Sequence, residues 1–149
     1  MLFYYCDQLP EKIKTQILEY ARVHGMAVYG AGECDKRYTD ITVNLTPFSW
    51  VDAFRNAEFV FTGTFHGVVF SILNHRQFKV YLTNKSRIAK VGSLLAEYQL
   101  HDRAMDDQFV FDLESMKDEI DYLAIDHMLY RRRRESMDYL RDSIEQCRK

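Results

Sequence analysis

The sequence has no long apolar segment and few cysteines, and each shortage excludes a class of protein. No apolar run approaches the roughly 18 residues of a membrane-spanning helix, and the run at Leu2–Cys6 ends at Asp7, too early for a signal peptide. The three cysteines, Cys6, Cys34 and Cys147, are odd in number and form no Cys-x-x-Cys pair. They are typical of free thiols in a reducing cytoplasm.

Charge of one sign is also scarce. With 20 basic and 22 acidic residues the net charge is −2, which does not favour nucleic-acid binding. The length of 149 residues and the 47% hydrophobic content indicate one globular domain without internal repeats. Four histidines show no metal-ligand spacing with carboxylates or cysteines, so no metal site is predicted. They are His24, His75, His101 and His127.

The most informative stretch runs from Phe59 to Phe70 and reads FVFTGTFHGVVF. Phe59–Phe61 is typical of a buried parallel strand, Thr62–Thr64 of a tight turn, and the residues that follow have helical spacing. Ligands of open α/β sheets bind at such strand–helix junctions, where unpaired helix N–H groups favour an anion. His66, in the first helical turn, is the side chain of this stretch best suited to proton transfer near neutral pH.

The rest of the chain alternates between β-favouring and helical patterns. We expect strands over residues 2–6, 26–29, 59–61, 78–82 and 105–111, and a loop over 33–45 that includes at most a short extended piece. We expect helices over 10–24, 47–56 and 66–75, from Asn84 or Ser86 to 98, and from about 113 to the C-terminus. This alternation predicts a Rossmann-like three-layer α/β sandwich with a mainly parallel sheet, in a single domain over residues 1–149.

Several short motifs occur in a defined order along the chain. They are Pro47–Trp50 before a helix, Asn56–Val60 leading into a strand, Thr62–Gly67 at the junction, Ser86–Ile88 before a leucine-rich helix, Asp102–Arg103 after it, and Arg134–Ser136 near the end. In this order they resemble the polysaccharide pyruvyl transferase family, whose members carry Ser/Thr-Phe-His-Gly or Arg-Leu-His-Gly at the junction. The resemblance covers nearly the whole chain.

The resemblance implies the C-terminal half of a two-domain fold similar to that of GT-B glycosyltransferases. It also implies transfer of a pyruvyl group from phosphoenolpyruvate to sugar hydroxyls, which forms a ketal on a cell-surface polysaccharide or its lipid-linked precursor. The implied partners are this small anionic donor, a glycan or lipid-linked sugar acceptor, and a missing N-terminal domain or another protein chain. We expect no cofactor other than the donor, and a location in the cytoplasm, including the inner membrane surface.

Candidate site residues follow from the junction and from the resemblance. His66 is the predicted catalytic acid or base, and a core histidine bonded to a backbone carbonyl is the alternative. The predicted substrate-binding residues are Thr64, Phe65, Gly67, Ser86, Arg87 and Arg103. Where some family members have an arginine that contacts the donor, this chain has Thr64, which can cap the helix but cannot make a bidentate charged contact. Arg87 lies in a first helical turn, where a cation is mildly unfavourable unless an anion binds, and a surface arginine is the alternative.

Two other functions remain open from the sequence. One is a non-catalytic truncated half that acts as an interaction module, and the other is a glycosyltransferase half that uses a nucleotide-sugar. The run Arg131–Arg134 is flanked by acidic residues and precedes an apolar stripe, which favours an interface over nucleic-acid binding. The stripe consists of Met137, Leu140, Ile144 and Cys147.

Overall fold

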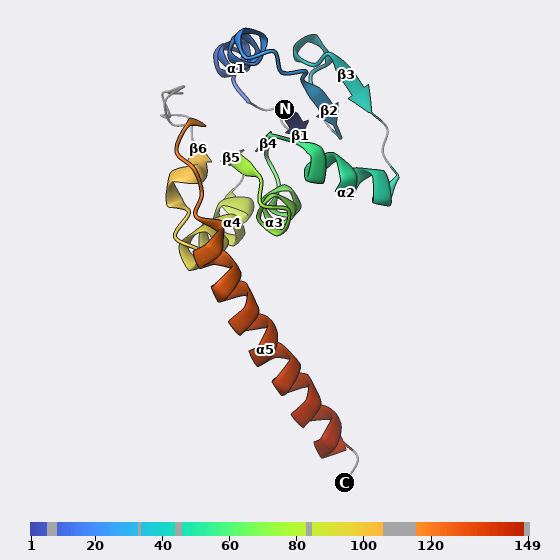
Figure 1. The fold of residues 1–149 in the computed structure, drawn as a ribbon, viewed down its shortest axis with the longest axis vertical. Coiled ribbons are helices and arrows are strands. Elements are labelled where there is room, and N and C mark those ends of the chain that lie inside the picture. Colours follow the sequence, from blue (N-terminus) through green and yellow to red (C-terminus); the bar gives the residue numbers. More distant parts are fainter. Residues whose placement is uncertain (6–8, 33, 44–45, 83–84, 106–115, 148–149) are drawn as a thin grey trace. The chain divides into compact units, whose positions relative to one another are not determined.

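The computed structural model describes residues 1–5, 9–32, 34–43, 46–82, 85–105 and 116–147 (Figure 1). The chain divides into two compact units, Met1–Glu119 and Ile120–Lys149, and each is described by itself. The first unit holds a β-sheet with its helices, and the second holds a single long helix.

The first unit is built on a six-stranded sheet in which every neighbouring pair of strands is parallel. The strand order is β3-β2-β1-β4-β5-β6. The strands are β1 (Leu2–Tyr4), β2 (Tyr29–Ala31), β3 (Ile41–Val43), β4 (Phe59–Thr62), β5 (Gln77–Tyr81) and β6 (Ala104–Met105). Because the chain forms β2 and β3 on one side of β1 before it returns to form β4 on the other, the strand order reverses between β1 and β4.

Helices cover both faces of this sheet. They are α1 (Glu11–Val23), α2 (Pro47–Asn56), α3 (Phe65–Leu73) and α4 (Lys85–Glu97), with short 3₁₀ turns η1 (Lys36–Tyr38) and η2 (His101–Arg103). Figure 1 shows α1 on one face and α2, α3 and α4 on the other, as right-handed crossovers in opposite directions require. The predicted Rossmann-like three-layer sandwich is therefore confirmed.

Apolar side chains from both faces of the sheet form the core. On the α1 face, the rings of Phe3 and Phe61 meet edge to face with centroids 5.5 Å apart, and both belong to a buried cluster with Ile17. Side chains alternate along a strand, so the fully buried Val60 and Phe78 lie on the opposite face, which α2, α3 and α4 cover. Burial on both faces explains why these strands are short runs of apolar residues.

Two helix ends lie where the sequence predicts them. Thr46 caps α2, because its hydroxyl accepts a hydrogen bond from the backbone N–H of Ser49 at 3.3 Å and Pro47 occupies the first helical position. Gly25 follows α1 with a φ of 66°, a left-handed conformation that glycine adopts without strain.

The predicted second strand is shifted in the structure. It covers Tyr29–Ala31 instead of 26–29, so Gly30, just past the predicted end, lies inside it. A Cβ atom at Gly30 would lie only 2.7 Å from Cγ2 of Thr39, so this glycine permits the segment before β3 to pack closely against β2. The stretch expected as a loop with at most a short extended piece contributes β3, so the sheet has six strands, more than the sequence predicts.

The last helix begins later than predicted. In the second unit, α5 spans Tyr122–Cys147, whereas we expected helix from about residue 113. A carboxylate oxygen of Asp121 accepts hydrogen bonds from the N–H groups of Leu123 and Ala124, and this cap fixes the start. Of the strand predicted over 105–111, the start belongs to β6, and residues 106–111 lie outside the described part. No helix of the described residues is long and apolar enough to cross a membrane.

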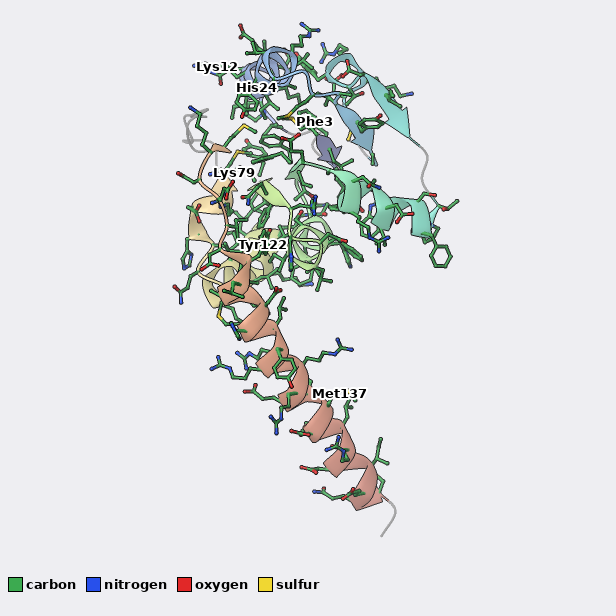
Figure 2. The ribbon with its side chains drawn as sticks, in the orientation of Figure 1. Phe3, Lys12, His24, Lys79, Tyr122 and Met137 are labelled. Atoms are coloured by element: carbon green, nitrogen blue, oxygen red, sulfur yellow. The ribbon has the colours of Figure 1, made fainter. Side chains whose placement is uncertain are left out.

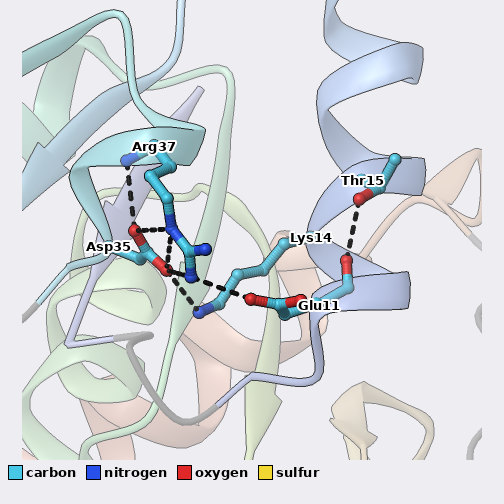
Figure 3. A network of polar contacts seen from close by, with 5 residues as sticks. All are labelled: Glu11, Lys14, Thr15, Asp35 and Arg37. Atoms are coloured by element: carbon cyan, nitrogen blue, oxygen red, sulfur yellow. Dashed lines mark hydrogen bonds and ion pairs between the residues drawn. The ribbon is translucent and has the colours of Figure 1, made fainter.

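An ion-pair network joins α1 to η1 (Figure 3). Nη2 of Arg37 lies 2.7 Å from the Asp35 carboxylate and 2.8 Å from that of Glu11. Nζ of Lys14, on a buried side chain, lies 3.7 Å from Asp35. Hydrogen bonds from the side chain and backbone of Arg37, helped by the two nearby positive charges, hold the pKa of Asp35 well below its usual range.

We expect the Asp35 carboxylate to stabilise the fold at neutral pH and to lose this effect in acid. Its folded-state pKa lies below the value of about 3.9 for an unfolded aspartate, so its contribution is complete above that pH and is lost as the pH falls through the folded-state pKa. Asp35→Asn should lower Tm at neutral pH, and its difference from the parent chain should shrink below about pH 4. Thermal melts followed by circular dichroism measure both quantities.

Glu19→Gln is the matched control for this prediction. It removes the exposed carboxylate of Glu19 in α1, and no ion pair of this side chain is seen among the described residues. We expect a smaller change in Tm for this control at neutral pH. Equal losses in both variants, or an Asp35→Asn difference that does not change with pH, would contradict the assignment.

Candidate functional site

The turn between β4 and α3 lies where the strand order of the sheet reverses. Tyr4, the last residue of β1, is paired with Thr62, the last residue of β4. The next N–H along the chain, that of Gly63, donates to the Tyr4 carbonyl at 3.3 Å. In open α/β sheets, ligands bind in the crevice beyond the carboxyl ends of such a pair of strands.

Two threonine hydroxyls organise the β4–α3 turn. The N–H of Thr64 donates to Oγ1 of Thr62 at 3.2 Å, and Oγ1 of Thr64 accepts from the N–H of Gly67 at 3.0 Å, which caps α3. No described group accepts a hydrogen bond from the N–H of Phe65 or His66. The start of α3 therefore presents two free donors at the positive end of a helix dipole, an arrangement suited to an anion.

His66 stands exposed in the first turn of α3. Its ring meets the ring of Phe65 edge to face with centroids 6.0 Å apart, and Phe65 is itself partly exposed. Within the described residues, the imidazole makes no hydrogen bond or ion pair. The alternative of a core histidine bonded to a backbone carbonyl therefore does not hold, and the ring is open to a ligand from solvent.

Arg87 reaches the same turn from the first turn of α4. Its Nη1 donates to the carbonyl of Gly63 at 3.3 Å, one residue before the Thr64 cap. No other bond from this exposed guanidinium is seen in the described residues, so its remaining donors are available to a ligand. A cation at this end of α4 is opposed by the dipole of that helix, and a bound anion would offset the repulsion.

The structure separates the predicted site residues into two groups. Thr64, Phe65, His66, Gly67 and Arg87 lie together at the carboxyl edge of the sheet. The side chain of Ser86 lies outside the described part, although its backbone belongs to the first turn of α4.

Arg103 is not brought to this turn. It immediately precedes β6, at the amino end of that strand, and its side chain is buried. Its Nη2 donates to the Asp118 carbonyl at 2.8 Å, and its Nε lies 2.8 Å from the Asp102 carboxylate. These contacts tie η2 to the chain that follows β6, which is a structural role.

Tyr5 is a candidate that sequence reasoning missed. It follows β1 with a φ of 53°, a left-handed conformation that costs a non-glycine residue about 1–2 kcal/mol. A Cβ at Gly32 would overlap its ring, and a Cβ at Gly63 would lie 2.5 Å from its carbonyl oxygen. Strained residues of this kind gather at functional sites. The only sequence signal is the pair of glycines that makes room for Tyr5.

The phenol beside Tyr5 is held in its neutral form. Burial raises the pKa of Tyr4, and the nearby Tyr5 side chain adds to the effect. Tyr4 also packs against Trp50 and Phe54 of α2, with ring centroids 5.3 and 5.4 Å away. This shift disfavours a negative charge on Tyr4 at the end of β1.

A cavity of about 400 Å³ lies at the other edge of the sheet. It is lined by residues at the starts of β1 and β2 and by the face of α2 that carries Ser49, Asp52 and Asn56. Because these strands are parallel, their starts and the β4–α3 turn lie at opposite edges of the sheet. The cavity is therefore not part of the candidate site.

The packing of Gly67 gives a direct test of how the turn is built. A Cβ at this position would overlap the hydroxyl of the fully buried Thr62. We expect Gly67→Ala to destabilise the chain by about 1–3 kcal/mol, the usual cost of overpacking. Urea unfolding followed by circular dichroism measures the change in free energy.

Gly92→Ala is the matched control, because a Cβ at Gly92 in α4 meets no atom within 4 Å. There the gain in helix propensity should stabilise the chain by about 0.5–1 kcal/mol. If both substitutions shift stability in the same direction, the close contact between Gly67 and Thr62 is not what demands glycine.

Comparison with known proteins identifies the family of the chain. The sequence model of the polysaccharide pyruvyl transferase family matches residues 2–84, which is more than half of the chain. No curated protein and no solved structure matches the chain. The matched segment runs from β1 through β5 and contains the complete β4–α3 turn with Thr64, Phe65, His66 and Gly67. The chain therefore belongs to the polysaccharide pyruvyl transferase family.

Proposed function

We propose that the chain is the donor-binding half of a polysaccharide pyruvyl transferase and that the β4–α3 turn binds phosphoenolpyruvate. One observation carries the proposal: two free N–H groups of α3 and the guanidinium of Arg87 converge on one turn. Oriented amides and a guanidinium are the groups that proteins use to hold phosphate and carboxylate oxygens. The free donors favour an anionic ligand, and membership of the family suggests that this anion is phosphoenolpyruvate.

Arg87 supplies the positive charge that Thr64 lacks. Threonine occupies the position at which the resemblance leads us to expect arginine in some members, and here its hydroxyl is used to cap α3. The Arg87 guanidinium approaches the same turn from α4 and bonds to Gly63, the residue before Thr64. A donor anion at the start of α3 would therefore still meet a cation, from a different helix.

His66 is the proposed proton donor and acceptor. Pyruvyl transfer adds a proton to the methylene carbon of phosphoenolpyruvate, forms two C–O bonds from sugar hydroxyls to its central carbon, and releases inorganic phosphate. One hydroxyl proton accounts for the new C–H bond and the other leaves with phosphate. In this proposal the exposed imidazole passes a proton between a hydroxyl and the substrate, or donates a hydrogen bond to the phosphate.

The acceptor glycan is proposed to bind with the help of another domain or chain. The described residues around the turn offer donors for a small anion, and the His66 ring is exposed to solvent. Transfer of a group between substrates needs both held in reacting geometry with water excluded. We therefore expect this chain alone to bind the donor and to show little turnover.

Phosphoenolpyruvate titration followed by NMR tests the donor site. We expect chemical-shift changes in the His66 ring and in the N–H groups of Phe65 and His66, and smaller changes with pyruvate, which lacks the phosphate. The absence of any response in these groups at millimolar phosphoenolpyruvate, in a sample with the dispersed spectrum of a folded protein, would refute donor binding here.

Arg87→Ala tests the proposed role of the guanidinium. Loss of a charge-assisted hydrogen bond should weaken phosphoenolpyruvate binding by about tenfold or more. Arg55→Ala is the matched control, because Arg55 is an exposed arginine in the last turn of α2 that pairs with Asp52 at 2.8 Å. The affinity of Arg55→Ala for phosphoenolpyruvate should stay within about twofold of that of the parent chain. Equal losses in both variants would mean that only overall charge matters.

A nucleotide-sugar also carries phosphates that the same groups could hold, so a glycosyltransferase half is the competing function. Addition of UDP-glucose or GDP-glucose during the phosphoenolpyruvate titration distinguishes the two. We expect phosphoenolpyruvate to hold the site against an equal concentration of either nucleotide-sugar. Displacement at lower concentration would favour the nucleotide-sugar and would overturn the proposed donor without removing the anion site.

A further inference from the structure

A cavity of about 400 Å³ lies on the α2 face of the sheet, at the starts of β1 and β2. Leu2 of β1 pairs with Tyr29 of β2, so their side chains share one face of the sheet. That face is the one that α2 covers, because Tyr4, two residues after Leu2, packs against Trp50. Phe3, which precedes Tyr4 and is labelled in Figure 2, belongs to the buried cluster on the α1 face. The cavity is therefore bounded by the strand starts and by α2.

One part of the lining is apolar, and packing fixes its position. Met1, Leu2 and Ala57 line the cavity and are themselves buried. Ala53 and Ala57 lie four residues apart on one side of α2, where their small side chains leave space that larger ones would fill. Tyr29 adds an aromatic side chain that is 41% exposed. Pockets that bind small molecules have this character, with volumes of about 300–1,000 Å³, apolar and aromatic walls and a few polar groups.

The other part of the lining is polar and comes from α2. Ser49, Asp52 and Asn56 follow one another at steps of three and four, so they lie along one side of the helix. Nδ2 of Asn56 donates to the Asp52 carbonyl at 2.9 Å, which orients the amide and leaves its oxygen as an acceptor. One carboxylate oxygen of Asp52 accepts from Arg55 at 2.8 Å, and no bond to the other is seen in the described residues. The cavity therefore offers both donors and acceptors.

The charges at the cavity favour a neutral ligand. Asp52 is the charged side chain among the described residues that line it, so an anion would be repelled. The pairing of Asp52 with Arg55 balances this charge, which weakens its attraction for a cation. The hydroxyl of Ser49, the amide of Asn56 and the phenol of Tyr29 are neutral, and each can donate and accept a hydrogen bond. A ligand rich in hydroxyl groups matches this set, because every hydroxyl also does both.

We propose that this cavity binds a sugar ring of a glycan. The apolar C–H groups of the ring pack against Tyr29, Ala53 and Ala57, and its hydroxyls bond to the polar side chains of α2. The site goes beyond the proposed function, because it lies at the opposite edge of the sheet from the β4–α3 turn and needs no phosphoenolpyruvate. A glycan attached at this edge would stay close to the chain, which raises its effective concentration at any second sugar site.

Titration with simple sugars, followed by NMR, tests the cavity directly. The probes are the methyl glycosides of glucose, galactose, mannose and N-acetylglucosamine, each at up to about 50 mM, because one ring in an open cavity predicts a roughly millimolar dissociation constant. We expect at least one of them to shift the side-chain amide of Asn56 and the backbone N–H groups of Tyr29 and Ala53. Methyl glucuronide has a ring of the same size with a carboxylate, and it should bind more weakly than methyl glucoside.

A matched pair of variants tests whether the sugar occupies the cavity. Ala53→Leu places a larger side chain in the space, and it should weaken binding of the sugar by about tenfold or more. Ala96→Leu makes the same change at an exposed position of α4, and it should leave the affinity within about twofold of the parent chain. Circular dichroism should show that both variants are folded. Neither variant should change the response of His66 to phosphoenolpyruvate, so this site and the donor site can fail independently.

Three results would overturn the proposal. If none of the four glycosides shifts the groups of the cavity, it is not a sugar site. If Ala53→Leu and Ala96→Leu weaken binding equally, the sugar does not occupy the space beside Ala53. If methyl glucuronide binds as tightly as methyl glucoside, the charge of Asp52 does not select a neutral ligand.

Discussion

The hydrogen bond between the Gly63 N–H and the Tyr4 carbonyl joins β1 to β4, the two strands between which the strand order reverses. It extends the pairing of β1 with β4 by one residue and brings the Tyr5 carbonyl so close that position 63 has no room for a side chain. The carbonyl of the same glycine accepts from Arg87. One residue therefore fixes the ends of two strands and attracts a guanidinium from α4. The candidate site follows from this constraint, because its donors are aligned by a backbone that has little freedom to move.

The β4–α3 turn is also an example of incomplete capping. Thr62 and Thr64 satisfy the N–H groups of Thr64 and Gly67, and no described acceptor serves Phe65 or His66. Helix starts carry several unsatisfied donors, and water can satisfy them at an exposed end. The start of α3 differs from an ordinary helix start in the groups that lie near it. These are an arginine from a neighbouring helix, an exposed imidazole, and a strained tyrosine at the adjacent strand end. Strain of this kind is tolerated where the surroundings fit it, and here Gly32 and Gly63 leave the room that Tyr5 occupies.

Local signals in the sequence were sufficient for the turn, and long-range contacts were not predictable from them. The strand, the hydroxyl cap and the helical spacing around Thr64 lie within twelve residues, so propensity and capping rules apply directly. The contact between Arg87 and Gly63 joins residues 24 positions apart, and the room for Tyr5 comes from Gly32 and Gly63, which lie in two other parts of the chain. The place of Gly30 inside β2 was not predictable either, because the residue that packs against it, Thr39, precedes the next strand. Arg103 resembles the family pattern, yet its partners are backbone and carboxylate groups away from the turn.

The chain thus carries two unsatisfied surfaces of opposite chemistry, and their difference argues that they serve different ligands. The β4–α3 turn offers N–H groups and a guanidinium, which bind a small charged anion well. A macromolecule at this turn would also have to remove water from the exposed imidazole, which costs free energy. The stripe on α5 offers apolar side chains over several helical turns, which no small anion can cover. Salt should separate the two effects. Added ions would compete directly with an anion at the turn, whereas burial of the apolar stripe responds less to salt. A ligand at one surface would therefore not take the place of a ligand at the other.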